Sequence, residues 1–204
     1  GISFTHPAKF ILVGTMNPEE GDLRPQLLDR FAFSVHMSGL NDPEQRVAIM
    51  ERRIAFEVDP DGFYDKWTEK ERQMSEQIAR AKKQVNKVLY TRRDMLSIAG
   101  LTSLLKVDGH RADIKILRGA QAHAAFQGRT QITDEDIILA AELALPHRIK
   151  GRPFQETSMN ATDLEQRLED VQSDLGMAEE GEPSEEQKET EEKTDEIIDA
   201  SGKN

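Results

Sequence analysis

The chain of 204 residues contains no cysteine and has 38 acidic and 27 basic side chains, which gives a formal charge of −11. The absence of cysteine excludes disulfides and thiolate metal sites, and no apolar run approaches the roughly 18–20 residues needed to span a bilayer. We therefore expect a cytoplasmic protein without a membrane span.

The acidic excess is confined to the C-terminal part of the sequence. Residues 163–204 hold 16 acidic and 4 basic side chains, which leaves residues 1–162 at a net charge of about +1. This near-neutral part lacks the basic stripe and interleaved aromatic residues typical of nucleic-acid-binding proteins. We therefore expect no nucleic-acid partner.

The first predicted elements are two strands. Residues 9–15 (KFILVGT) form a short apolar run rich in branched side chains, as in a buried parallel strand. Asn17 and Pro18 end that strand, because Asn favours a turn and Pro cannot continue a ladder. A short helix over residues 23–29 leads to a second predicted strand over residues 31–37 (FAFSVHM). Residues 1–40 are thus predicted to be the end of an α/β core.

Residues 41–154 predict an all-α domain. Pro43 suits the first turn of a helix over residues 43–57, and an apolar stripe with spacings of three and four predicts another helix over residues 69–88. Further helices are predicted over residues 92–105, 111–126 and 134–145, the last beginning with a capping box at Thr133. The predicted fold class is therefore mainly α, with two strands of an α/β core before the helical domain.

Residues 155–204 are predicted to be an acidic linker or tail that is largely disordered. Residues 177–193 consist mostly of Glu, Ser, Lys and Thr, and cannot bury enough apolar surface to offset the chain entropy lost on folding. Residues 162–175 alone keep a sparse stripe, compatible with a short amphipathic helix.

Asn17 is a candidate for phosphate chemistry. It follows the first predicted strand, and ligands bind at the carboxyl ends of strands in open α/β sheets. An amide there could orient the water that attacks a terminal phosphate. The alternative is that Asn17 only builds the turn before Pro18, and the local sequence by itself favours that simpler interpretation.

Arg30 and Arg111 are candidate phosphate-binding cations. Arg30 lies between the short helix and the second strand, where it could act on a neighbouring subunit's phosphate; such arginine fingers raise rates about 10³–10⁵-fold. The alternative is a surface pair with Asp29, which contributes at most about 1 kcal/mol. Arg111 is predicted in the first turn of a helix, where the helix dipole disfavours a cation. This position indicates a partner outside the helix, although pairing with Asp108 or Asp113 is equally compatible.

The longer motifs that contain these residues resemble the ATPase subunit of magnesium chelatase, an AAA+ motor that drives metal insertion into a porphyrin. The specific string is GTMNPEEGDLRPQLLDRF at residues 14–31. The motifs FYDKW (63–67), DGHRADI (108–114) and LALPHRIKGRPF (143–154) fit the helical lid domain of that family. The resemblance extends from Gly1 to about Phe154, and implies that residues 1–40 end the AAA+ core and residues 41–154 form its lid.

The resemblance also implies roles and partners. Asn17 corresponds to sensor 1, Arg30 to the arginine finger, and Arg111 to sensor 2, which reports nucleotide state from the lid. The implied cofactor is ATP with magnesium, bound in a ring of copies, a hexamer. The implied partners are an integrin-like (VWA) subunit or domain and a porphyrin-binding catalytic subunit of tetrapyrrole (chlorophyll) biosynthesis.

Two departures from the family limit these expectations. The sequence has no GxxxxGK[ST] phosphate loop and no apolar strand that ends in paired acids, so we expect no ATPase activity from these 204 residues alone. The acidic tail resembles the linker that precedes a VWA domain in the partner subunit and in fused forms. The metal that the parent protein inserts can therefore be magnesium or cobalt. Alternatives are a MoxR-like AAA+ chaperone that activates a metalloenzyme through a VWA partner, and an interaction module with a degenerate ATPase fold.

No protein metal site is predicted. The five histidines are scattered, without a paired spacing of three or four residues. His147 is instead expected to pack or to make a lid contact.

Overall fold

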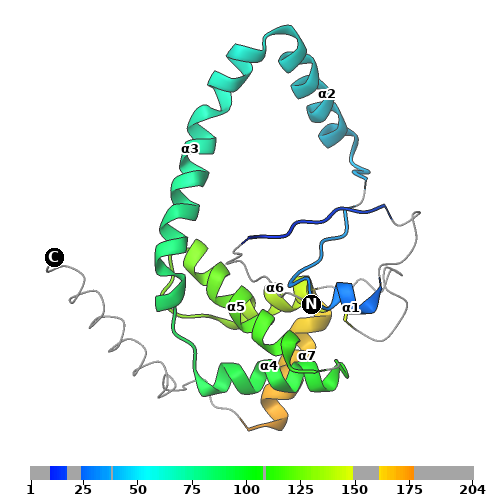
Figure 1. Cartoon of the computed structure of the whole chain (residues 1–204), viewed down its shortest axis with the longest axis vertical. Helices are drawn as coiled ribbons and strands as arrows, with labels where there is room; N and C mark the ends of the chain where they lie inside the picture. The colour runs from blue at the N-terminus through cyan, green and yellow to red at the C-terminus, as the bar shows by residue number, and fades with distance from the viewer. Residues whose placement is uncertain (1–9, 18–23, 38, 108, 149–160, 177–204) are drawn as a thin grey trace, which may run out of the picture.

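The computed structural model describes residues 10–17, 24–37, 39–107, 109–148 and 161–176. Within them the chain is mainly helical, as predicted, and it divides into a bundle of four helices and a long hairpin of two helices that rises from it (Figure 1). The predicted disorder over residues 155–160 and 177–204 lies outside the described residues, as does Asp108.

The bundle consists of α4 (Arg92–Leu104), α5 (Arg111–Phe126), α6 (Asp134–Ala144) and α7 (Ala161–Asp174). Helices α5 and α6 make its closest contact, because the facing residues are small: a Cβ added to Gly119 would lie only 2.9 Å from the Cβ of Ala140. The core combines these small residues with branched ones. Its fully buried members include Ile98, Leu101, Ile116, Ala120, Ala124, Ile137, Ala141, Leu145 and Leu164.

Side-chain caps fix where two of the bundle helices begin. At α4 the backbone N–H of Thr91 donates to Asp94 Oδ2 (2.7 Å), and the Asp94 N–H donates to Thr91 Oγ1 (3.2 Å). At α6 the Thr133 N–H donates to Asp136 Oδ2 (2.8 Å), which confirms the predicted capping box with Asp in place of Glu. Each box satisfies helix N-terminal donors that have no partner within the helix.

The hairpin consists of α2 (Pro43–Val58) and α3 (Pro60–Gln84), the latter followed by the short 3₁₀ turn η2 (Val85–Lys87). Neither α2 nor α3 contains a buried residue. Asp59 lies between the two helices and caps the start of α3 by accepting a hydrogen bond from the Gly62 N–H (3.0 Å). Near this turn the rings of Phe56 and Phe63 meet edge to face at 5.7 Å.

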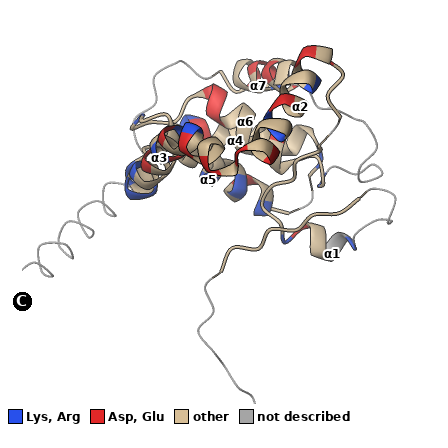
Figure 2. Cartoon of the chain, turned by 90° about the horizontal axis from the view of Figure 1, so that it is seen from above, with Lys and Arg blue, Asp and Glu red and all other residues tan. Residues whose placement is uncertain are grey.

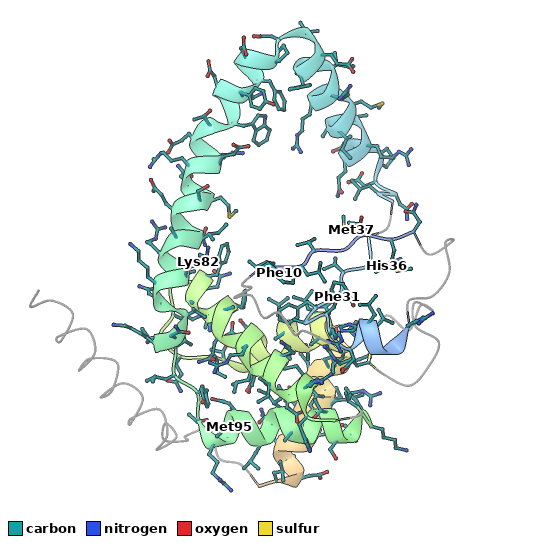
Figure 3. All side chains as sticks on the ribbon, viewed as in Figure 1. Phe10, Phe31, His36, Met37, Lys82 and Met95 are labelled. Carbon is teal, nitrogen blue, oxygen red and sulfur yellow. The ribbon has the colours of Figure 1, made fainter. Side chains whose placement is uncertain are left out.

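The two predicted strands are not formed in the structure. The described residues 10–17 and 31–37 are extended but belong to no sheet, and the apolar run is open to solvent, with Phe10 76% and Val13 81% exposed. A buried parallel strand needs a strand on each side to pair its N–H and C=O groups, and the described residues supply none. The two segments instead touch through the Phe31 ring, which lies close to Gly14 (Figure 3).

The folded bundle includes α7, which lies within the region whose composition predicted a disordered tail. Leu164, Leu168 and Val171 of α7 are buried, and α7 packs against both α4 and α6. The amphipathic helix predicted over residues 162–175 is thus confirmed, but it belongs to the bundle. Assigning all of residues 155–204 to the tail was wrong for α7, because its acidic residues face solvent while three apolar ones complete the core.

Candidate nucleotide-sensing site

The segment that carries Arg30 is attached to the four-helix bundle. It follows α1 (Pro25–Leu28), the short helix predicted from the sequence. The Ser34 N–H donates to the Leu143 carbonyl of α6 (2.9 Å), and Phe33 lies against α5 at Gly119. Residues 29–34 are therefore fixed against α5 and the end of α6.

Arg111 pairs with Asp29. Its guanidinium Nη1 donates to Asp29 Oδ2 across 82 residues of sequence. Of the two alternatives from the sequence, Asp113 lies 3.6 Å from the His110 ring instead of pairing with Arg111, and Asp108 lies outside the described residues. The Arg111 side chain is 68% exposed, and a pair at such a surface contributes at most about 1 kcal/mol. Arg111 can therefore leave Asp29 for a stronger anion at little cost.

Arg30 is exposed, and its side chain has no ion pair among the described residues. Its backbone N–H donates to the Leu27 carbonyl (3.0 Å), which ends α1. The side chain is thus carried on an ordered backbone and directed to solvent. The predicted alternative, a pair with the adjacent Asp29, is not formed, since Asp29 faces Arg111 and Arg148.

His147 makes the lid contact that was expected of it. Its Nε2 lies 3.3 Å from the Phe31 carbonyl, and its Nδ1 lies 3.0 Å from Ser34 Oγ. Because a carbonyl can only accept, Nε2 carries the proton and Nδ1 accepts from the Ser34 hydroxyl. Burial and the neighbouring Arg148 lower the pKa of His147 below 6.5, so the ring is neutral at physiological pH.

Arg148 and Asp29 are site residues that the sequence reasoning missed. The Arg148 side chain is 4% exposed, and its Nε lies 3.8 Å from Asp29 Oδ1. Burial lowers the pKa of this guanidinium, while Asp29 partly opposes that shift. The available signal was the position of Arg148 just beyond a helix C-terminus, where a cation meets unpaired carbonyls.

Asn17 is not brought to the other candidates by the described residues. It is exposed, and no hydrogen bond among the described residues connects it to Arg30 or Arg111. The structure therefore pairs Arg111 with Asp29, the chain neighbour of Arg30, and leaves Asn17 on the first extended segment. Two guanidinium groups, those of Arg111 and Arg148, face the one carboxylate of Asp29, and this excess of positive charge suits an anionic ligand such as a phosphate.

Other kinds of site find little support in the described part of the chain. No cluster of three or more His, Asp or Glu side chains suited to a metal ion occurs there. None of its helices is both long enough and apolar enough to cross a membrane. Basic and acidic side chains are mixed along α3, while α7 carries mainly acidic ones (Figure 2).

Comparisons with known proteins identify the bundle. Residues 95–170 match the AAA lid domain family. The chain is 44% identical over 168 residues to the magnesium-chelatase subunit ChlI homolog of Methanocaldococcus jannaschii, an alignment that covers 82% of this chain and 46% of that protein. It is 41% identical over 155 residues to the magnesium-chelatase subunit ChlI of Euglena gracilis, which covers 76% of this chain and 44% of that protein.

A third relative is longer. An uncharacterized protein of Mycobacterium tuberculosis is 43% identical over 168 residues, which is 82% of this chain and 27% of that protein. The chain thus spans less than half the length of these curated relatives. The chain is thus similar to ChlI-type AAA+ proteins over about four fifths of its length, and residues 95–170 match the AAA lid domain.

Proposed function

We propose that this chain is part of an AAA+ motor subunit of a magnesium or cobalt chelatase, which couples ATP hydrolysis to metal insertion into a tetrapyrrole. The observation that carries the proposal is the contact of Arg111 with Asp29. This contact joins a lid arginine to the residue next to Arg30, so that the two cations assigned to nucleotide recognition belong to one assembly. The names of the two magnesium-chelatase relatives also support a role in a chelatase.

In this proposal Arg30 is the arginine finger and Arg111 is sensor 2. An exposed Arg30 on a fixed backbone suits contact with the ATP of a neighbouring subunit, which requires a ring of copies. Arg111 exchanges Asp29 for phosphate when nucleotide binds. Asn17 is assigned to sensor 1 from its motif alone, and ATP with magnesium is the cofactor in the complete ring.

The remaining assignments follow from the same proposal. Residues 1–40 contribute the end of the AAA+ core, and the helical region from residue 41 forms the lid and its hairpin. In this proposal the acidic residues beyond the bundle form a linker to an integrin-like (VWA) domain or bind a VWA subunit. ATP hydrolysis drives metal insertion by a porphyrin-binding catalytic subunit. We place the protein in the cytoplasm.

The test is ATP hydrolysis by the complete subunit with Arg30→Ala or Arg111→Ala. We expect Arg30→Ala to lower kcat by at least about 10³-fold, as for other arginine fingers, and Arg111→Ala to weaken nucleotide binding as well. Arg53→Ala is the matched control: Arg53 is an exposed arginine on α2 that pairs with Glu57 (2.7 Å), and its loss should leave kcat unchanged. Unchanged hydrolysis in both site variants would instead support an interaction module with a degenerate ATPase fold.

A second assay separates the chelatase from a MoxR-like chaperone. The complete subunit is combined with its VWA and porphyrin-binding partners, a porphyrin, ATP, and either magnesium or cobalt, and insertion is followed by absorbance. Insertion that depends on Arg30 supports the chelatase and identifies its metal. Hydrolysis without insertion of either metal would favour the chaperone.

A further inference from the structure

Arg148 is a buried cation whose contacts are to the backbone around Arg30. Nη1 donates to the Ala32 carbonyl (3.1 Å) and Nη2 donates to the carbonyls of Phe31 and Asp29, the latter at 3.5 Å. These carbonyls lie on both sides of residue 30. At 4% exposure the guanidinium cannot reach a ligand on another subunit. Arg148 can therefore act only through the backbone segment to which it donates hydrogen bonds.

The same guanidinium is tied to the lid. Nη1 also donates to the carbonyl of Ala144, the last residue of α6, where the helix dipole favours a positive charge. Arg148 therefore bridges the end of a lid helix and the segment that carries Arg30. Burying a guanidinium carries a large desolvation cost, which the hydrogen bonds of Nη1 and Nη2 to both the Arg30 segment and α6 offset in part.

His147 strengthens the bridge from the adjacent position. Its Nε2–H donates to the Phe31 carbonyl, which Arg148 also contacts, and its Nδ1 accepts from Ser34. Together the two side chains hold residues 29–34 at four points while leaving the Arg30 side chain exposed. The finger segment is therefore attached to the lid by both side chains, and a displacement of the finger by 1 Å can cost about 100-fold in rate.

We infer that Arg148 and His147 are positioning residues for Arg30, which transmit the placement of the lid to the arginine finger. This inference rests on the proposed function, in which Arg30 acts on the nucleotide of a neighbouring subunit. Neither residue touches nucleotide in this scheme.

The experiment measures kcat, KM and nucleotide affinity for the complete ring with Arg148→Lys. Lysine keeps the charge, but its single ammonium cannot reproduce the fork that spans several carbonyls. We expect kcat to fall at least 10-fold, while the Kd of a fluorescent ATP analogue changes less than threefold. The matched control is Arg129→Lys, at the other end of α6, where the guanidinium contacts Asp136 through both Nη atoms. It should lower Tm and leave kcat within twofold.

A double variant distinguishes positioning from simple loss of stability. If Arg148 acts through Arg30, then Arg30→Ala combined with Arg148→Lys is no slower than Arg30→Ala alone. A further drop in kcat in the double variant, or an unchanged kcat in Arg148→Lys alone, overturns the inference. If Arg30→Ala itself retains full kcat, the finger assignment fails, which is a separate result.

His147 provides a second route if the Arg148→Lys ring does not assemble. His147→Ala removes the donor to the Phe31 carbonyl, whereas His147→Gln can restore an N–H near the position of Nε2. We expect kcat to fall severalfold in the alanine variant and to recover at least half of that loss in the glutamine variant, at equal ring content. Equal kcat in the two variants and the unsubstituted ring would overturn the inference.

Discussion

The bundle and the hairpin are both helical, but different interactions hold them together. The bundle buries residues such as Leu101 and Ile116 completely, whereas α2 and α3 bury none. The hairpin relies on local features instead: the Asp59 cap, pairs such as Arg72 with Glu69 and Glu76, and aromatic contacts near its turn. Helical sequence alone therefore does not indicate where the stability of this chain resides.

The largest expected effect of a single substitution is in the bundle core. Leu101→Ala removes a fully buried side chain and should lower the free energy of unfolding by about 2–5 kcal/mol, since a cavity adds to the lost transfer free energy. Ile54→Ala on α2, where the side chain is 59% exposed, should change it by less than about 0.5 kcal/mol. Urea denaturation of both variants measures the difference. Similar losses in the two would mean that the hairpin is as tightly packed as the bundle.

The second-largest effect on the free energy of unfolding is expected from replacing Asp136, whose carboxylate is buried. It accepts hydrogen bonds from both Nη atoms of Arg129 (2.5 and 2.6 Å) and from the Thr133 N–H (2.8 Å), and it lies 2.5 Å from His123 Nδ1. Burial raises its pKa, but these hydrogen bonds outweigh burial and leave the pKa below 3.8. Asp136→Asn should cost about 3 kcal/mol, the lower end for breaking a buried ion pair, because Arg129 reaches water.

The pH dependence of that loss follows from the direction of the shift. A carboxylate with a lowered folded-state pKa contributes stability that is complete above its unfolded pKa and disappears as the pH falls through the folded value. Thermal unfolding between pH 7 and pH 3 should therefore show a decline below about pH 4 that is reduced in Asp136→Asn. Equal acid dependence in the two proteins would show that other carboxylates govern it.

A third substitution tests the packing of α7 on the bundle. A Cβ added to Gly100 would lie 2.3 Å from Val171 Cγ1, so Gly100→Ala should lower the free energy of unfolding by about 1–3 kcal/mol through overpacking. Val171→Ala makes room, and the double variant should recover part of the loss. Gly39→Ala is the control, because nothing lies within 4 Å of its added Cβ. Without a difference between the two glycine variants, α7 would not be docked as described.

The sequence predicted the helices well because their signals are local. Proline at the first turn, the capping box at Thr133 and apolar stripes specify α2, α5 and α6 within a few residues of the structure. The strands were not formed because a strand depends on distant partners, which the described residues do not supply. Composition concealed the role of α7, in which only three apolar residues, Leu164, Leu168 and Val171, are buried.

The site was only partly predictable for the same reason. Arg30 and Arg111 were recognised through motifs, but the contact that joins them to one assembly uses Asp29, which is 82 residues from Arg111. The role of Arg148 depends on backbone carbonyls of residues 29, 31 and 32. Every residue has such a carbonyl, so no side-chain pattern could single these out.

The smallest expected effect is at the hairpin turn and tests whether hairpin and bundle unfold together. Asp59→Ala removes the N-cap of α3 and should cost about 1 kcal/mol of local helix stability. Among the described residues, α3 packs against α5 of the bundle, where Gln77 Nε2 donates to the Phe126 carbonyl (2.9 Å). Amide exchange should therefore accelerate in the first turns of α3 while the Tm of the bundle stays within about 1 °C, since locally stable units open separately. The control is Asp65→Ala, which replaces an exposed acid further along α3 and should change neither the amide exchange nor the Tm. A lower bundle Tm in Asp59→Ala would show that the two regions form one cooperative unit.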